Sequence, residues 1–327
     1  MSDNPADQSE TQELSKFKTY VSDTISQQAR DYESALAVII PSDPTVDDMP
    51  RVRKETADFY QPIVDEVKNE FTDSLEKTQI AGVPVLTIVP KNYKKANDKK
   101  CIFYIHGGAY VLGDPMSLLM LSAPVAYHTG IKVCSIDYRL APEHPYPAAA
   151  DDCFKVYTEL LKQYKPVNLA LYGDSAGGAL TLVTALRASR KGLALPAAMV
   201  LSSPWADITK TGDSYYLLEG WDCLIHYEMN LRKAAEVYTG DNDWKNPDIS
   251  PLYADYPAKF PPTLIITGTR DLLLSSCARL QRVMKRAGIE VHLDVWEGMW
   301  HDFVGFPFLP ESQEAMKEIA AFMTARI

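Results

Sequence analysis

The stretch from residue 167 to residue 189 constrains the fold of this chain more than any other. Residues 167–172 (Val-Asn-Leu-Ala-Leu-Tyr) favour a β-strand, the next six are small and turn-forming, and residues 179–189 carry apolar side chains at helical spacing. This pattern predicts a strand, a sharp turn and a helix. A serine in such a Gly-x-Ser-x-Gly turn exposes its hydroxyl above the sheet, so Ser175 is predicted to be a nucleophile rather than a helix-capping residue.

Apolar strands alternate with helices along the rest of the chain. The expected strands are 79–90 (bent, or in two pieces), 101–105, 131–137, 198–203, 263–267 and 290–296. The expected helices are 14–40, 51–71, 118–128, 148–164, 275–287 and 311–327, while 1–12 is expected to be disordered and 91–100 a solvated loop. Because most strands are apolar throughout, we expect an α/β fold with a mostly parallel sheet that helices cover on both faces.

Composition and charge limit the partners of this chain. The formal net charge of −10 disfavours nucleic acid and anionic membranes, and it favours a small uncharged substrate. No apolar run approaches the roughly 18 residues of a membrane span, and the polar, acidic residues 1–10 are unlike a secretory signal. The five scattered cysteines form no CxxC pair, which predicts buried free thiols in a cytoplasmic protein and no metal site.

Two further residues at strand ends complete a candidate acyl-transfer site. Asp271 follows the expected strand 263–267, and His301 follows the expected strand 290–296 in a glycine-containing loop. A serine nucleophile needs a histidine base and a carboxylate that orients it, which predicts the triad Ser175, Asp271 and His301. Asp302 is the competing carboxylate, but a loop neighbour usually points away from the imidazole, so we expect Asp271 to fill this role.

Backbone donors for an oxyanion are expected after strand 101–105. The stretch from His106 to Ala109 contains two glycines, which permit backbone N–H groups to turn toward one point near Ser175. The N–H of Ala176 would contribute a further donor from the turn itself. We therefore predict an oxyanion hole formed by Gly107, Gly108, Ala109 and Ala176.

Taken together, these motifs resemble those of the bacterial hormone-sensitive-lipase-type esterases of the α/β-hydrolase fold. The matching stretches are His106-Gly-Gly-Ala109, Asp137-Tyr-Arg-Leu-Ala-Pro-Glu143, Gly173-Asp-Ser-Ala-Gly177, Ser203-Pro-Trp205 and Gly268-Thr-Arg-Asp271. The resemblance implies a serine carboxylesterase that cleaves short- to medium-chain esters through an acyl-enzyme, without a cofactor. It also ranks Gly108 and Ala109 above Gly107 as oxyanion donors.

The chain also departs from the family pattern. Ala109 replaces the third family glycine, and Ser275 stands where many members have a second aspartate, which leaves the support of the Asp271 loop open. Some motifs are similar to those of epsilon-lactone hydrolases. A lactone hydrolase, or an amidase or formamidase with the same triad, is therefore the alternative activity.

The resemblance also implies a helical cap over the site. We expect residues 1–75 to form part of the cap, 76–204 the first part of the catalytic domain, 205–262 a cap insertion and 263–327 the rest of the catalytic domain. A homodimer is one oligomeric state that the sequence leaves open. The residues expected to line an apolar substrate pocket are aromatic: Tyr110, Trp205, Tyr215, Tyr216, Trp221 and Phe303.

Overall fold

The computed structural model describes residues 23–35 and 47–327, and its centre is an eight-stranded sheet of order β1-β2-β4-β3-β5-β6-β7-β8. At one edge, β1 (Thr72–Ile80) and β2 (Val83–Pro90) form an antiparallel hairpin, and β2 pairs antiparallel with β4. All the other neighbouring strands pair in parallel. The mostly parallel sheet confirms the predicted α/β fold.

The parallel strands form where runs of apolar residues are buried on both faces. Their bounds are β3 (Cys101–Ile105), β4 (Val133–Ile136), β5 (Leu169–Asp174), β6 (Ala198–Ser202), β7 (Thr263–Gly268) and β8 (Val291–Trp296). Every residue of β3 to β7 is buried, whereas β8 at the sheet edge has exposed residues. A strand covered on both faces has no polar side to alternate with, which explains these continuous apolar runs.

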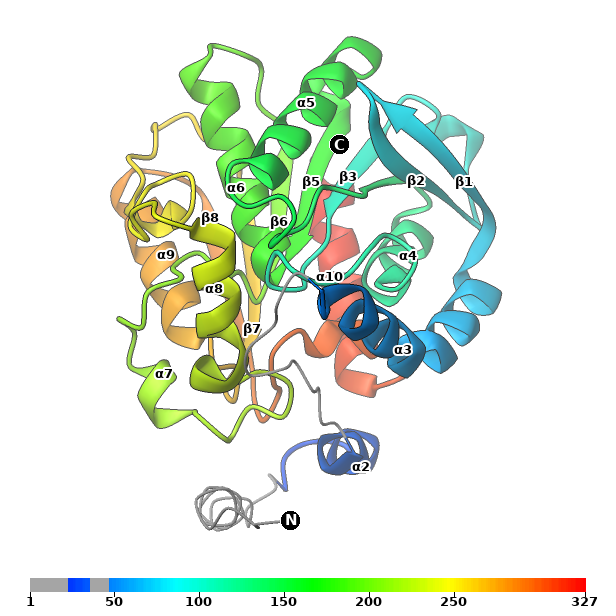
Figure 1. The fold of residues 1–327 in the computed structure, drawn as a ribbon. Helices are drawn as coiled ribbons and strands as arrows, with labels where there is room; N and C mark the ends of the chain where they lie inside the picture. Colours follow the sequence, from blue (N-terminus) through cyan, green and yellow to red (C-terminus); the bar gives the residue numbers. More distant parts are fainter. Residues whose placement is uncertain (1–22, 36–46) are drawn as a thin grey trace, which may run out of the picture.

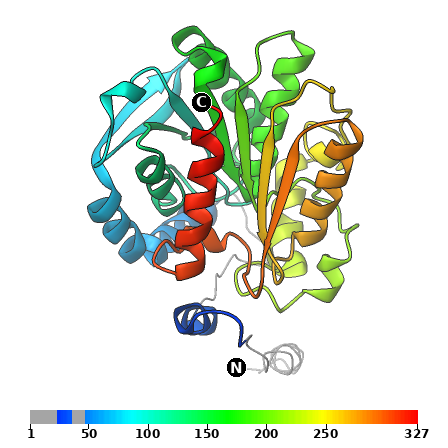
Figure 2. The same cartoon turned by 180° about the vertical axis from the view of Figure 1, so that it is seen from behind.

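Helices cover both faces of the sheet. On one face lie α5 (Ala148–Gln163), α6 (Ser175–Arg190) and α9 (Leu274–Arg286), and Figure 1 shows α5 and α6 in front of the strands. On the other face lie α4 (Leu119–Thr129) and α10 (Pro310–Thr324), with α10 in front in Figure 2. Right-handed crossovers between parallel strands place the helices in this way.

The segment 205–262 and helix α3 lie outside these layers. The segment contains α7 (Ser214–Leu217), the π-helical turn η3 (Tyr227–Leu231), α8 (Arg232–Thr239) and η4 (Pro251–Tyr253), and α3 spans Met49–Phe71 and packs on α4. Short 3-10 turns occur at Lys95–Asn97, Pro166–Asn168 and Phe303–Gly305. Ion pairs fasten the segment to the main helices, with Asp207 2.6 Å from Arg279 of α9 and Asp248 2.7 Å from Arg187 of α6.

The N-terminal third differs most from the sequence prediction. The expected disorder of 1–12 lies wholly outside the described residues. The expected helix 14–40 lies partly outside them, and its described part is helical only at α2 (Gln27–Ala35). The expected strand 79–90 is indeed two pieces, but β1 begins at Thr72, which the sequence did not reveal. This edge strand is polar and mostly exposed, so it has no apolar pattern to detect.

Two further predictions concern the whole chain. All five cysteines are buried free thiols, as expected. Among the described residues, no helix is both long enough and apolar enough to span a lipid bilayer.

Candidate active site

The turn between β5 and α6 holds Ser175 in a strained backbone conformation. Its φ is +50°, which side chains other than glycine rarely adopt. Close packing explains the neighbouring Gly177, because a Cβ there would lie 2.0 Å from the carbonyl oxygen of Ile105 on β3. Such strain persists only where the surroundings impose it, and it directs the Ser175 hydroxyl toward the carboxyl ends of the strands.

The structure brings together the three residues of the predicted triad, although Ser175 lies 126 positions and Asp271 lies 30 positions before His301 in the sequence. His301 Nε2 lies 3.0 Å from Ser175 Oγ, and His301 Nδ1 lies 3.2 Å from Asp271 Oδ1. All three side chains are buried, with Asp271 fully inaccessible to solvent. This arrangement can pass a proton from the hydroxyl to the imidazole while the carboxylate fixes the ring.

Hydrogen bonds hold Asp271 in place. Its Oδ2 accepts a hydrogen bond from Thr267 Oγ1 at 2.7 Å, and its Oδ1 accepts one from the N–H of Leu273 at 2.8 Å. Burial by itself would raise the pKa of Asp271, but the charge of His301 and the hydrogen bonds from the side chains of His301, Ser203 and Thr267 outweigh it and hold the pKa below its usual value. Asp271 is therefore an ionised partner for the imidazole.

Asp222 supports the same loop and was missed by the sequence analysis. Its Oδ2 accepts hydrogen bonds from the N–H of Leu272 at 2.9 Å and from the N–H of His301 at 3.2 Å, so one carboxylate ties the Asp271 loop to the His301 loop. Burial and the charge of Asp271 raise the pKa of Asp222 to about 6. Ser275 anchors the loop differently, through reciprocal bonds with Ser214 of 2.9 and 3.0 Å.

Asp302 does not point away from the imidazole, so that sequence prediction is wrong. Its Oδ2 lies 3.1 Å from His301 Nε2, the nitrogen that also faces Ser175. A left-handed backbone at Asp302, with φ of +49°, turns the side chain back toward the ring. Asp271 remains the partner of Nδ1.

The loop after β3 exposes backbone donors beside Ser175. The φ angles of Gly108 and Ala109 are +96° and +52°, and no group among the described residues accepts a hydrogen bond from either N–H. A buried N–H without a partner, as at Ala109, is rare unless a ligand uses it. Gly107 differs, because its N–H donates to Asp174 Oδ2 at 2.9 Å. Its predicted role as an oxyanion donor is therefore contradicted.

Asp174 sets the position of this loop. Its second oxygen, Oδ1, accepts a hydrogen bond from the hydroxyl of Tyr104 at 2.6 Å. The carboxylate thus joins β3, the oxyanion loop and the Ser175 turn at one buried point. The sequence signal was the aspartate within Gly173-Asp-Ser-Ala-Gly177, although the motif by itself assigned this residue no role.

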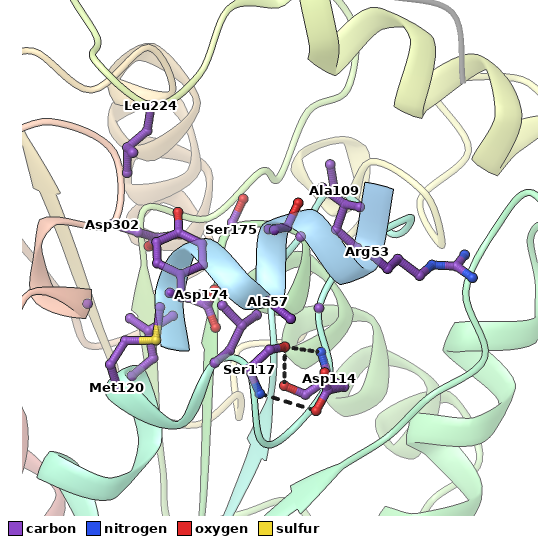
Figure 3. A pocket seen from close by; sticks show the side chains of 18 of the residues that line it. Arg53, Ala57, Ala109, Asp114, Ser117, Met120, Asp174, Ser175, Leu224 and Asp302 are labelled. Carbon is purple, nitrogen blue, oxygen red and sulfur yellow. Dashed lines mark hydrogen bonds between the residues drawn. The ribbon is translucent and has the colours of Figure 1, made fainter. Parts of the chain in front are cut away.

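A cavity of about 320 Å³ opens above Ser175. Figure 3 shows Ser175 and Asp302 inside it, with Ala57 and Arg53 on α3, Met120 on α4 and Leu224 from segment 205–262. Asp114 and Ser117 hydrogen-bond each other and fix the loop that forms one wall. The apolar residues of the lining come from five separate stretches: Ala57, Ala109, Leu112, Leu118, Met120, Leu121, Leu140, Leu224, Ile225, Leu231 and Phe306.

The six aromatic residues expected in the pocket do not line it. Tyr110 is buried against Tyr238, with ring centroids 3.7 Å apart, and Trp205 is likewise buried nearby. Tyr215 and Phe303 are core residues, Trp221 stacks on Arg270, and Tyr216 is 65% exposed. None of these six side chains is part of the cavity lining, whose apolar residues are mainly aliphatic.

Arg53 clamps α3 over the cavity. Its guanidinium forms two hydrogen bonds of 2.7 Å with the carboxylate of Glu143 and also donates to the carbonyl oxygens of Val111 at 2.8 Å and Ala141 at 3.0 Å. Val111 lies two residues after Ala109, so the side chain of Arg53 joins the helix above the cavity to the chain that leaves the oxyanion loop. A bidentate pair of this kind is stronger than an ordinary surface ion pair.

Comparison with known proteins agrees with this geometry. The family model described as the alpha/beta hydrolase fold matches residues 102–305, which include Ser175, Asp271 and His301. The chain belongs to the α/β-hydrolase family. Within this family it is similar to an esterase of Acinetobacter venetianus, with 33% identity over 81% of this chain and 88% of the relative.

Two further relatives narrow the branch of the α/β-hydrolase family. An acetyl-hydrolase of Streptomyces hygroscopicus is 37% identical over 69% of this chain and 76% of that protein. A solved structure of a hormone-sensitive lipase from a metagenome library superposes with a TM-score of 0.82 at 32% identity, covering 93% of this chain and 99% of that one. The protein is a carboxylic ester hydrolase of the hormone-sensitive-lipase type.

Proposed function

We propose that the protein hydrolyses small carboxylic esters with Ser175 as the nucleophile. The observation that carries this proposal is the continuous chain of contacts from Ser175 Oγ through His301 to Asp271, of 3.0 and 3.2 Å, at the base of the cavity. The relatives are esterases and acetyl-hydrolases, which favours an ester substrate over the lactone or amide alternatives.

In this proposal the reaction has two steps. Ser175 Oγ attacks the ester carbonyl carbon, its proton passes to His301 Nε2, and the backbone N–H groups of Gly108, Ala109 and Ala176 stabilise the oxyanion. The imidazolium then protonates the departing alcohol, which leaves an acyl group on Ser175. A water molecule hydrolyses this acyl-enzyme by the same route, with His301 as its base.

A fluorophosphonate probe tests the identity of the nucleophile. The probe phosphonylates an activated serine, so peptide mapping is expected to find the label on Ser175. Labelling is expected to vanish in His301→Ala, because the base that activates the hydroxyl is then absent. A label on another serine would remove Ser175 from the proposed role.

Substrate size is the second prediction. Each acyl methylene that enters the aliphatic cavity gains about 0.8 kcal/mol, but only until the cavity of about 320 Å³ is full. We therefore expect kcat/KM for p-nitrophenyl esters to peak at acyl chains of about two to eight carbons and to fall steeply by palmitate. The Streptomyces relative, named as an acetyl-hydrolase, supports short acyl groups. Activity that rises through palmitate and on emulsified triglyceride would contradict this.

The Arg53 clamp gives a third prediction. Arg53→Met keeps the aliphatic stem but removes the charge, so α3 loses its ties to Glu143 and the oxyanion loop. We expect kcat/KM to fall on the order of tenfold, with a smaller loss for long acyl chains than for acetate because the roof is looser. The matched control is Arg51→Met on the same helix, whose exposed pair with Glu55 lies outside the cavity lining. Equal losses in both variants would show a general effect of helix charge.

A further inference from the structure

The imidazole of His301 is held by a carboxylate on each side. Asp271 Oδ1 lies 3.2 Å from Nδ1, and Asp302 Oδ2 lies 3.1 Å from Nε2. Ser175 Oγ shares Nε2 at 3.0 Å. The nitrogen that has to receive the serine proton therefore faces two oxygen atoms, one of them from a carboxyl group.

The position of Asp302 is fixed by its surroundings. Its N–H donates to Ser203 Oγ at 3.1 Å, and its Oδ1 accepts a hydrogen bond from Ser202 Oγ at 2.9 Å. Ser202 is the last residue of β6 and Ser203 follows it, so the two serines anchor Asp302 to the end of the sheet. The second carboxylate oxygen, Oδ2, is left to face His301, and the side chain is only 12% exposed.

This contact requires a proton. A neutral imidazole with its hydrogen on Nδ1 has a lone pair on Nε2, and a lone pair does not face a carboxylate oxygen at 3.1 Å without repulsion. A proton between Nε2 and Oδ2 turns the repulsion into a charge-assisted hydrogen bond. With this proton in place, Nε2 cannot accept the proton of Ser175.

We propose that Asp302 is a positioning residue that keeps His301 protonated on Nε2 in the resting enzyme and thereby sets the pH above which hydrolysis begins. This inference rests on the proposed function. The activating step is loss of the Nε2 proton to solvent, after which the Ser175 hydroxyl donates to the freed lone pair. When the serine proton then arrives, the same carboxylate stabilises the imidazolium.

The other carboxylates around the ring also favour a protonated imidazole, and the remaining polar groups of the lining do not oppose them. Asp271 faces Nδ1, Asp222 accepts a hydrogen bond from the His301 N–H, and Asp174 lies at the Ser175 turn. From α3, Tyr60 lines the cavity, and burial and the charge of Asp302 raise its pKa, so its hydroxyl stays neutral. Arg53, the arginine of the described lining, is engaged by Glu143.

The electrostatics agree with the geometry. Burial by itself would lower the pKa of His301, but Asp302 and Asp271 outweigh it and raise the pKa well above its usual value. Burial raises the pKa of Asp302, although the charge of His301 partly offsets this. Both shifts favour retention of one shared proton between the two groups as the pH rises.

The test compares kcat/KM for p-nitrophenyl acetate as a function of pH in the wild type and in Asp302→Asn. Without the carboxylate, the acid limb of the profile is expected to move to lower pH, so the variant gains on the order of fivefold below the wild-type midpoint. At alkaline pH the variant is expected to be slower by a similar factor, because it stabilises the imidazolium less. The two profiles therefore cross.

A matched variant separates this effect from loss of charge in general. Asp137→Asn removes another carboxylate that lines the cavity, and Asp137 is not hydrogen-bonded to His301. Its acid midpoint is expected to stay at the wild-type pH. A parallel loss in Asp302→Asn at every pH, or a midpoint that does not move, would overturn the proposal.

The protonation state of His301 can also be measured in the wild-type protein, which does not depend on the folding of Asp302→Asn. Nitrogen NMR of histidine-labelled protein is expected to show both ring nitrogens of His301 protonated at pH 7. A neutral ring at pH 7 would contradict the proposal. Ser175→Ala tests the proposed function separately, because activity that survives in that variant contradicts the function itself, whereas coincident pH profiles of the wild type and Asp302→Asn contradict only the role of Asp302.

Discussion

Ser175→Ala is expected to lower kcat by about 10⁶-fold, the largest effect of any substitution proposed for this protein. The hydroxyl is the atom that bonds to the acyl carbon, and among the described residues no other hydroxyl or thiol is hydrogen-bonded to His301 Nε2. The remaining rate is expected to come from the oxyanion donors and substrate binding alone. Single-turnover kinetics with p-nitrophenyl acetate measure the loss.

His301→Ala and the double variant complete this experiment. His301→Ala is expected to cost about as much as Ser175→Ala, and the double variant no more than either, because both residues serve one proton transfer. Ser189→Ala, at the far end of α6, is the matched control and is expected to keep full activity. A double variant far slower than either single variant would show that the two residues act independently.

The strands of the sheet could be predicted because each is a short, fully apolar run. Residues 101–105 (Cys-Ile-Phe-Tyr-Ile) are a good example, since all five are buried in β3. The order of Ser175, Asp271 and His301 was equally visible, because each residue lies shortly after the end of a strand and parallel strands end at the same edge of the sheet. Local pattern and chain order were sufficient for these features.

The polar framework of the site could not be predicted because it depends on contacts between distant segments. Asp222 lies in the segment 205–262, 79 positions before the His301 N–H that it binds, and nothing in its neighbours marks it. The left-handed backbone that turns Asp302 toward His301 occurs at a residue other than glycine, so the sequence carries no signal for it. The role of Gly107 likewise depended on a partner 67 positions away, Asp174.

The pocket lining was the least predictable feature. Large aromatic side chains in the segment 205–262 suggested a binding surface, yet the structure uses Trp205 and Tyr215 as core residues. The cavity is instead lined by aliphatic side chains such as Leu224 and Ile225, which occur throughout any core. Residue type alone does not separate a side chain that lines a cavity from one that fills the core.

Asp271→Asn is expected to lower kcat by about 10⁴-fold, a smaller loss than that of Ser175 or His301 because the carboxylate orients the imidazole and does not itself react. An amide at this position offers its NH₂ group to His301 Nδ1, which moves the ring hydrogen to Nε2 and leaves no lone pair for the Ser175 proton. In this protein Asp302 increases the loss, because its Oδ2 lies 3.1 Å from Nε2 and favours a hydrogen on that nitrogen. The loss is expected in kcat with little change in KM, which steady-state kinetics on p-nitrophenyl butyrate measure.

Thr267→Val is the matched control for this last experiment. It removes the 2.7 Å hydrogen bond to Asp271 Oδ2 but leaves the carboxylate, and the side chain keeps its shape. Because the Leu273 N–H still holds Oδ1 at 2.8 Å, we expect kcat to fall only on the order of tenfold. If Asp271→Asn cost no more than Thr267→Val, Asp271 would be a structural residue, and the orienting carboxylate would have to be sought at Asp222 or Asp302.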